Sequence, residues 1–224
     1  MLILGIDDAG RGPVIGPMAL AGVLIESETE KEFIKLGIKD SKMLAPKKRE
    51  QLEKEIKKLA ISTETILVSV DEIDNKVGDK FNLNDREAIA SAQIINKINK
   101  SQKSLREIKV IIDCPSVNLK AWQEYLEKFL IAKTNLKVYC EHKADANHVV
   151  VGAASILAKV LRDSEVEKIK EKYKIEFGSG YASDPQTRNF IYDNYEKYKD
   201  KGIFRESWST VKKFKASKTQ KKLF

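Results

Sequence analysis

The chain has 224 residues, which suits one domain, or one domain with a small appendage, around a sizeable buried core. Hydrophobic residues make up 42% and charged residues 33%, so the composition excludes a low-complexity or fibrous chain and fits a globular one. Neither Cys114 nor Cys140 belongs to a C-x-x-C pair, which argues against a disulfide framework and a structural zinc site.

The formal net charge is +8, and much of the excess lies at the C-terminal end. The segment 209–224 contains six lysines and no acidic residue. This basic end favours a polyanionic partner such as nucleic acid. A solvated, poorly ordered tail is the alternative, and charge alone does not separate the two.

No segment of the sequence is long and apolar enough to predict a membrane span. The longest apolar stretch, 149–161, contains Lys159 and is too short to cross a bilayer. The chain begins directly with a strand-like run rather than with a basic region and a cleavable apolar stretch. We therefore expect a cytoplasmic protein without a membrane partner.

The beginning of the chain predicts a strand hairpin. Residues 2–6 form an apolar run that ends in Asp7-Asp8, and residues 10–13 are turn formers. A second apolar run covers 14–25. Two such runs with a short glycine-rich link predict an antiparallel hairpin, with a bulge near Gly16-Pro17.

Helices and strands then alternate. Strands are expected at 64–70, 109–113 and 136–140, and helices at 46–59, 83–98, 118–130 and 147–172. This order indicates an α/β domain with a mixed sheet.

Glycines at 178 and 180 interrupt the pattern. Asp184-Pro185 then resembles the N-cap and first residue of another helix. We expect a catalytic domain over 1–178 and a small helical C-terminal region with a basic tail over 179–224.

Four aspartates stand where carboxylates are costly. Asp7, Asp8 and Asp113 end apolar strands, and Asp163 continues an apolar helix stripe that includes Ile156. If they converge, their hard oxygen donors would select Mg²⁺ or Mn²⁺. The alternative is unconnected acids, with the strand-end residues in ordinary turns and Asp163 paired to a lysine one turn earlier, worth about 0.3 kcal/mol.

The turn Gly10-Arg11-Gly12 has two interpretations. Glycines let the backbone approach a ligand, so the turn could bind phosphate or sugar oxygens, with Arg11 adding a charge-assisted donor. It could also be an ordinary tight turn. The sequence contains no H-E-x-x-H zinc motif, no G-x-x-x-x-G-K-[ST] phosphate loop and no G-x-S-x-G nucleophile turn.

Together these residues resemble type 2 ribonuclease H (ribonuclease HII), most closely its archaeal members. The resemblance spans residues 5 to about 210 in the correct order. It is carried by Gly5–Pro17 (GIDDAGRGPVIGP), Asp40-Ser41-Lys42, Asp113, His142-Lys143-Ala144-Asp145, Ala153–Asp163 (AASILAKVLRD), Gly178-Ser179-Gly180-Tyr181, Ser183-Asp184-Pro185 and Trp208.

The resemblance implies a ribonuclease H-like fold, with a five-stranded mixed sheet flanked by helices and a small C-terminal helical region. It implies an endoribonuclease that hydrolyses the RNA strand of RNA–DNA hybrids and cuts at ribonucleotides in duplex DNA, with two metal ions and 5′-phosphate and 3′-hydroxyl products. The four metal ligands would be Asp7, Asp8, Asp113 and Asp163.

The resemblance also implies substrate contacts. Gly10, Arg11 and Gly12 would contact the ribose 2′-hydroxyl, and Lys42 and Lys143 would lie near the phosphates. Tyr181 would stack on the nucleotide at the DNA side of a junction, although without the resemblance a core or hinge aromatic is the favoured interpretation.

One position departs from the family pattern. The second acid is ordinarily glutamate, and here it is Asp8, whose carboxylate is withdrawn by about 1.5 Å. We expect an active enzyme with a preference for Mn²⁺. Two alternatives are a catalytically silent protein that binds hybrids and another nuclease of the same fold.

The final residues, Gln220–Phe224, resemble a shortened sliding-clamp-binding peptide. An exposed basic tail ending in two apolar residues is the other interpretation. We expect a monomer.

Overall fold

The computed structural model describes residues 1–38, 44–75, 81–102 and 106–221, with side chains up to residue 216. The chain divides into two compact units, each discontinuous in sequence. The first unit comprises 1–9, 19–67 and 81–161, and the second comprises 10–18, 68–80 and 162–224. Neither unit coincides with the expected ranges 1–178 and 179–224.

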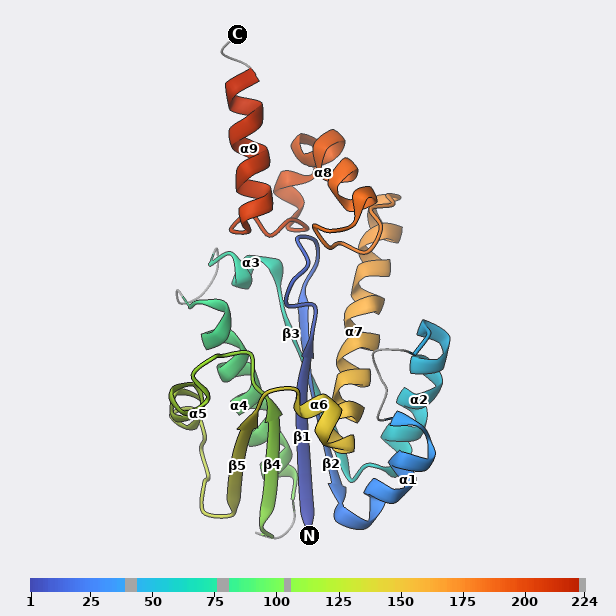
Figure 1. Ribbon diagram of the computed structural model, residues 1–224, viewed down its shortest axis with the longest axis vertical. Helices are drawn as coiled ribbons and strands as arrows, with labels where there is room; N and C mark the ends of the chain where they lie inside the picture. Colours follow the sequence, from blue (N-terminus) through green and yellow to red (C-terminus); the bar gives the residue numbers. More distant parts are fainter. Residues whose placement is uncertain (39–43, 76–80, 103–105, 222–224) are drawn as a thin grey trace. The chain divides into compact units, whose positions relative to one another are not determined.

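Strands and helices alternate along the described residues (Figure 1). The strands are β1 (Leu2–Ala9), β2 (Met18–Glu26), β3 (Ser62–Val68), β4 (Ile108–Asp113) and β5 (Leu136–Glu141). The helices are α1 (Glu30–Lys35), α2 (Pro46–Leu59), α3 (Val70–Ile73), α4 (Leu83–Ser101), α5 (Leu119–Glu127), α6 (Ala144–Asn147), α7 (Val149–Tyr173), α8 (Pro185–Tyr198) and α9 (Ser209–Lys221), with short 3₁₀ turns at η1 (Ser27–Thr29) and η3 (Lys199–Lys201).

The strands form one mixed sheet in the order β3-β2-β1-β4-β5, which confirms the predicted fold class. Strands β1 and β2 are antiparallel, with Ala9 opposite Ala19. Strand β4 runs parallel to both β1 and β5. The carboxyl ends of β1, β4 and β5 therefore meet at the same edge of the sheet, where ligands bind in many α/β proteins.

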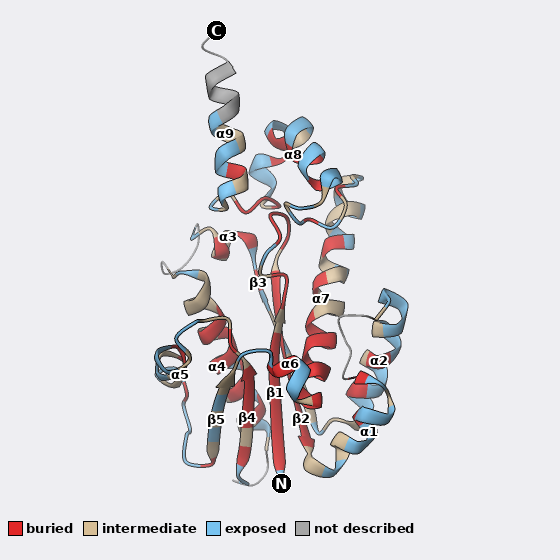
Figure 2. Ribbon diagram, viewed as in Figure 1, coloured by how far each residue is buried: buried red, intermediate tan, exposed pale blue. Residues whose placement is uncertain are grey.

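Helices of the first unit cover both faces of the sheet (Figure 2). On one face α7 packs directly on β1, since a Cβ added at Gly5 would lie 2.5 Å from the Val150 backbone. On the other face α4 packs over β2, where Gly22 faces Ile94. Successive residues of β1 point to opposite faces. As a result, Asp7 is directed toward the α7 face and Asp8 toward the α4 face.

The second unit has its own core, rich in aromatic residues. Phe190 on α8 contacts the rings of Phe177 and Phe204, with centroids 5.7 and 6.2 Å apart. Val14 and Ile15 are fully buried in the same cluster. This core holds the segment 10–18 against the C-terminal part of the chain.

The predicted second strand is wrong at its start, because β2 begins at Met18 rather than at residue 14. The preceding residues bond elsewhere: Val14 N–H donates to the Gly180 carbonyl, and Ile15 forms an isolated bridge with Phe204. The basic tail is helical as α9 through Lys221.

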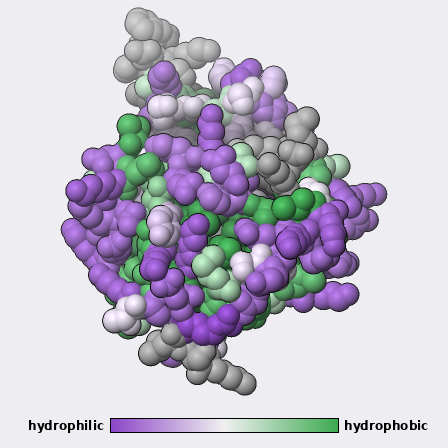
Figure 3. Space-filling model, turned by 60° about the horizontal axis from the view of Figure 1, so that its bottom comes forward, coloured by the Kyte–Doolittle hydropathy of each residue, from purple (hydrophilic) through white to green (hydrophobic). Residues whose placement is uncertain are grey.

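Among the described residues, no helix has the length and apolar character needed to cross a membrane. On the face shown in Figure 3, hydrophilic side chains predominate and hydrophobic ones are interspersed among them.

Candidate active site

An acidic pocket lies at the sheet edge where β1 and β4 end, within the first unit. The space that it outlines is about 200 Å³, part of which is open to solvent. Asp7, Asp8 and Asp113 all line it, so the structure brings together three of the four predicted metal ligands. The remaining lining residues are Ile6, Leu20, Glu87, Ser91, Ile112, Pro115 and Trp122.

The electrostatics of this pocket disfavour three ionised carboxylates. Asp7 is only 6% exposed. Its burial raises the pKa of its carboxyl well above the usual range, and the carboxylates of Asp8 and then Asp113 raise it further. Hydrogen bonds from the Ser155 side chain and from Asp8 N–H (2.8 Å) oppose this rise. A bound cation would relieve the repulsion without protonating Asp7.

Two buried acids that were not among the predicted ligands, Asp145 and Glu87, are also part of the first unit, and Glu87 lines the pocket. Ala144 N–H donates to Asp113 Oδ1 at 2.7 Å, and the next residue, Asp145, is 5% exposed. Glu87 on α4 is 2% exposed and lines the pocket. A signal for Asp145 existed, because β5 runs parallel to β4 and residues just beyond it reach the edge that holds Asp113.

Over the described ranges, no group of three or more His, Cys, Asp or Glu side chains is arranged so that it could hold a metal ion as it stands. Two of the carboxylates instead accept the backbone hydrogen bonds of Asp8 and Ala144. The donor chemistry of the pocket suits a hard divalent cation.

Of the two lysines predicted to lie near phosphates, only Lys143 is among the described residues. Lys143 is exposed and has a left-handed backbone (φ 58°), immediately before the amide that donates to Asp113. Lys42 lies outside the described residues.

The glycine-rich turn belongs to the second unit. Gly10 has a φ of +86°, a conformation that favours glycine, and an added Cβ would lie 3.0 Å from both Arg162 Cγ and the Pro17 carbonyl oxygen. A Cβ added at Gly12 would lie 3.4 Å from the Tyr181 ring. The structure thus brings the predicted turn and Tyr181 together. Tyr181 is 40% exposed, so it is not a core aromatic.

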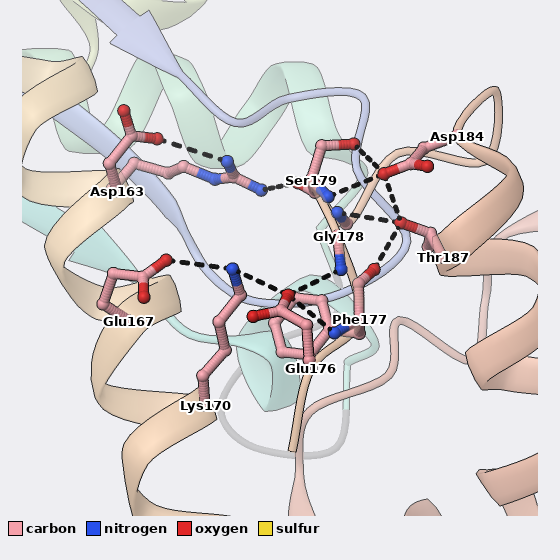
Figure 4. Close-up of polar contacts among 11 residues, drawn as sticks. Asp163, Glu167, Lys170, Glu176, Phe177, Gly178, Ser179, Asp184 and Thr187 are labelled. Carbon is pink, nitrogen blue, oxygen red and sulfur yellow. Dashed lines mark hydrogen bonds and ion pairs between the residues drawn. The ribbon is translucent and has the colours of Figure 1, made fainter. Parts of the chain in front are cut away.

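Asp163 also lies in the second unit and is less buried than its helix stripe predicted. Its side chain is 43% exposed and accepts a hydrogen bond from Arg162 Nη1 at 3.3 Å (Figure 4). Arg162 also donates to the Ser179 carbonyl at 2.9 Å and lies over the Tyr181 ring. Asp163 therefore has an arginine neighbour within its own unit.

The loop that carries Tyr181 is anchored by Asp184, the residue predicted to cap α8. Asp184 accepts hydrogen bonds from Ser179 N–H (2.7 Å) and the Ser179 hydroxyl (2.8 Å) (Figure 4). As the cap of α8 it also accepts one from Gln186 N–H. These bonds, led by the Ser179 N–H, lower the pKa of Asp184 to about 2. Thr187 adds a hydrogen bond to the Phe177 carbonyl. The loop is thus fixed on both sides of Gly180.

The fold and the acidic pocket are those of an α/β enzyme suited to divalent cations. Comparison with known proteins makes the class specific. The family model described as Ribonuclease HII matches residues 4–211. The ribonuclease HII of Methanocaldococcus jannaschii is 41% identical over 230 residues, covering 100% of this chain and 99% of that protein.

Solved structures agree with the sequence comparison. The crystal structure of ribonuclease H2 from Pyrococcus horikoshii has a TM-score of 0.84 and 37% identity, covering 97% of this chain and 98% of that one. The ribonuclease HII of Archaeoglobus fulgidus, solved in complex with PCNA, has a TM-score of 0.79 and 38% identity, covering 93% and 96%.

The chain belongs to the ribonuclease HII family. It is therefore a metal-dependent endoribonuclease that degrades the RNA of RNA–DNA hybrids.

Proposed function

We propose that the acidic pocket is the catalytic centre and that Asp7, Asp8 and Asp113 hold the divalent cations. The supporting observation is the convergence of these three side chains on one pocket, with the pKa of Asp7 raised by burial and by its two acidic neighbours. The charges of both Asp8 and Asp113 act on the Asp7 carboxyl. Asp7 is therefore the best candidate to contact both cations. When bound, a pair of divalent cations would activate the attacking water and stabilise the departing 3′ oxygen.

Two residues compete for the position of fourth ligand. The family resemblance supplied Asp163, which is half-exposed beside Arg162. The structure supports Asp145, which is buried in the same unit as the other three acids and follows the amide that binds Asp113. We propose Asp145 as the fourth ligand and retain Asp163 as the second candidate.

The variants Asp145→Asn and Asp163→Asn decide between them. Cleavage of a labelled hybrid and the thermal stabilisation by Mn²⁺ should both be lost in the ligand variant. We expect this loss for Asp145→Asn, while Asp163→Asn keeps the stabilisation by Mn²⁺. The reverse result would assign the position to Asp163.

The remaining residues bind and orient the substrate. We propose that the backbone of Gly10, Arg11 and Gly12 contacts the ribose 2′-hydroxyl, a group that can both donate and accept a hydrogen bond. Tyr181 stacks on the neighbouring nucleotide. Lys143, and Lys42 from outside the described residues, bind phosphates. Because one 2′-hydroxyl suffices for this recognition, the enzyme should also cut at single ribonucleotides in duplex DNA.

The reaction is hydrolysis of one phosphodiester bond. Water attacks phosphorus, the bond to the 3′ oxygen breaks, and that oxygen takes up a proton, which leaves 5′-phosphate and 3′-hydroxyl ends. When ionised, the carboxylates of the pocket only accept hydrogen bonds and serve to bind cations. Pro115 and Trp122 line the pocket beside these carboxylates.

Oxygen donors select Mg²⁺ or Mn²⁺, and we propose a preference for Mn²⁺ because Asp8 is shorter than the usual glutamate. The test compares wild type with Asp8→Glu on a hybrid and on a DNA duplex with one ribonucleotide, in each metal. We expect the rate ratio of Mn²⁺ to Mg²⁺ to fall in the variant. No cleavage by wild type with either metal would instead support a silent hybrid-binding protein.

A sliding clamp is a proposed partner. The support is the complex with PCNA formed by the Archaeoglobus fulgidus relative and the clamp-like end of this chain, Gln220–Phe224, whose last three residues lie outside the described ones. Deleting these five residues should abolish capture by an archaeal clamp and leave hybrid cleavage unchanged. Capture by the shortened chain would refute the assignment. We also propose that the protein is cytoplasmic and monomeric.

A further inference from the structure

A buried arginine lies beneath the glycine-rich turn. Arg205 is 0% exposed and belongs to the same compact unit as the turn. Its Nη2 donates to the Gly10 carbonyl at 2.6 Å, its Nη1 to the Arg11 carbonyl at 2.9 Å and its Nε to the Gly16 carbonyl at 2.9 Å. One guanidinium therefore holds three backbone carbonyls of a segment almost 200 residues away in sequence.

Trp208 extends the same arrangement. Its indole N–H lies 3.4 Å from the Gly12 carbonyl, and its ring covers the Arg205 guanidinium at 5.0 Å. Successive carbonyls of Gly10, Arg11 and Gly12 are thus all directed toward side chains of the C-terminal segment. A backbone hydrogen bond also joins the two segments, because Arg205 N–H donates to the Val14 carbonyl.

This arrangement fixes where the amide hydrogens of the turn point. In a planar trans peptide the C=O and the following N–H point in opposite directions. Since the Gly10 and Arg11 carbonyls face Arg205, the N–H groups of Arg11 and Gly12 point away from it. Gly12 is exposed, and a Cβ added there would lie 3.4 Å from the Tyr181 ring, so the turn adjoins the residue proposed to stack on the nucleotide.

We propose that Arg205 is a positioning residue for ribose recognition: it fixes the Gly10–Gly12 turn so that its amides are preorganised for the 2′-hydroxyl. The inference rests on the proposed role of the turn in contacting that hydroxyl. A planar fork with five N–H donors suits three carbonyls in a fixed arrangement, and a lysine ammonium cannot reproduce it.

The test combines a protein change with a substrate change. Wild type and Arg205→Lys are compared on a DNA duplex with one ribonucleotide and on the same duplex with a 2′-fluoro nucleotide there. We expect kcat/KM of the variant to fall by about 10- to 100-fold on the ribonucleotide, as for a misplaced recognition group. The fall should be much smaller on the 2′-fluoro substrate, because the hydroxyl contact is already absent. Arg106→Lys, an exposed arginine paired with Glu26, is the matched control and should leave both rates unchanged.

Each outcome is decisive. Equal losses on both substrates, with wild type distinguishing them, would make Arg205 merely structural and overturn the inference. Wild-type cleavage that ignores the 2′ substituent would overturn the proposed role of the turn, and the inference with it. If Arg205→Lys fails to fold, Trp208→Phe replaces it. That variant removes the donor to Gly12 and keeps an aromatic ring beside Arg205. It should show the same substrate-dependent loss, and equal loss on both substrates would again refute the proposal.

Discussion

Replacing Asp7 by asparagine removes one charge from the buried acidic pocket while keeping an oxygen that can accept the Asp8 N–H. Burial and the Asp8 and Asp113 carboxylates raise the pKa of Asp7 in the folded protein. For an acid whose folded pKa is raised, ionisation destabilises the fold. Stability is therefore lost as pH rises from the unfolded value, about 3.9, through the folded pKa. Above the folded pKa, the full free-energy cost of ionising buried Asp7 is present.

The size of the effect follows from linkage. Each unit by which folding raises the pKa costs about 1.4 kcal/mol. For a chain of this length that corresponds to a Tm change of about 3 to 6 °C per unit. We therefore expect metal-free Asp7→Asn to melt above wild type at pH 8, with the difference vanishing toward pH 4.

Bound metal should reverse the order of the two melting temperatures, so that wild type melts above Asp7→Asn. At a concentration of Mn²⁺ 100 times its Kd, the wild-type protein gains about 2.7 kcal/mol, and a variant that has lost the central ligand gains less. The assay is thermal denaturation in EDTA and in Mn²⁺ at both pH values, together with hybrid cleavage and binding. Cleavage should be abolished and hybrid binding retained. The exposed Asp193→Asn is the control. A metal-free variant that melts below wild type at pH 8 would refute the electrostatic reasoning.

Three further predictions concern the second unit and the sheet. Tyr181→Ala should slow cleavage most at single-ribonucleotide junctions, and an equal loss on continuous RNA would remove the stacking role. Asp184→Ala should lower the Tm at neutral pH; because its pKa is about 2 against an ordinary 3.8, the difference should shrink as pH falls through that range. Gly5→Ala should destabilise by about 1 to 3 kcal/mol, since its Cβ would meet the Val150 backbone; an unchanged Tm would show that α7 can shift.

Local signals predicted the elements that carry the pocket. The apolar runs before Asp7 and Asp113 gave β1 and β4, and their carboxyl ends meet because parallel neighbours share an edge. Pro46 marked the first residue of α2, and Asp184 marked the cap of α8. These features depend on neighbours in sequence and need no knowledge of tertiary contacts.

Other features were decided by distant residues. The segment from Val14 leaves the strand because its hydrogen-bond partners are Gly180 and Arg205. The burial of Glu87 likewise depends on tertiary packing that no periodicity contains. For α9, a signal was present but unused: Val211 and Phe214 are spaced for one helix face, and both pack in the second core.

Asp163 shows how a correct pattern can mislead. The stripe through Ile156 faces the first core, and extending it predicted a buried carboxylate at Asp163. The boundary between the two compact units falls between Leu161 and Arg162, within α7. The helix continues past this boundary, but the core of the first unit ends there. Arg162 is the residue with the buried side chain at this point, and Asp163 is half-exposed beside it. Periodicity reports which residues share a face of a helix, but burial also requires a partner for that face along its whole length. The same reasoning favours Asp145, which lies in the short helix α6 just beyond β5 and directly follows the Ala144 amide that donates to Asp113.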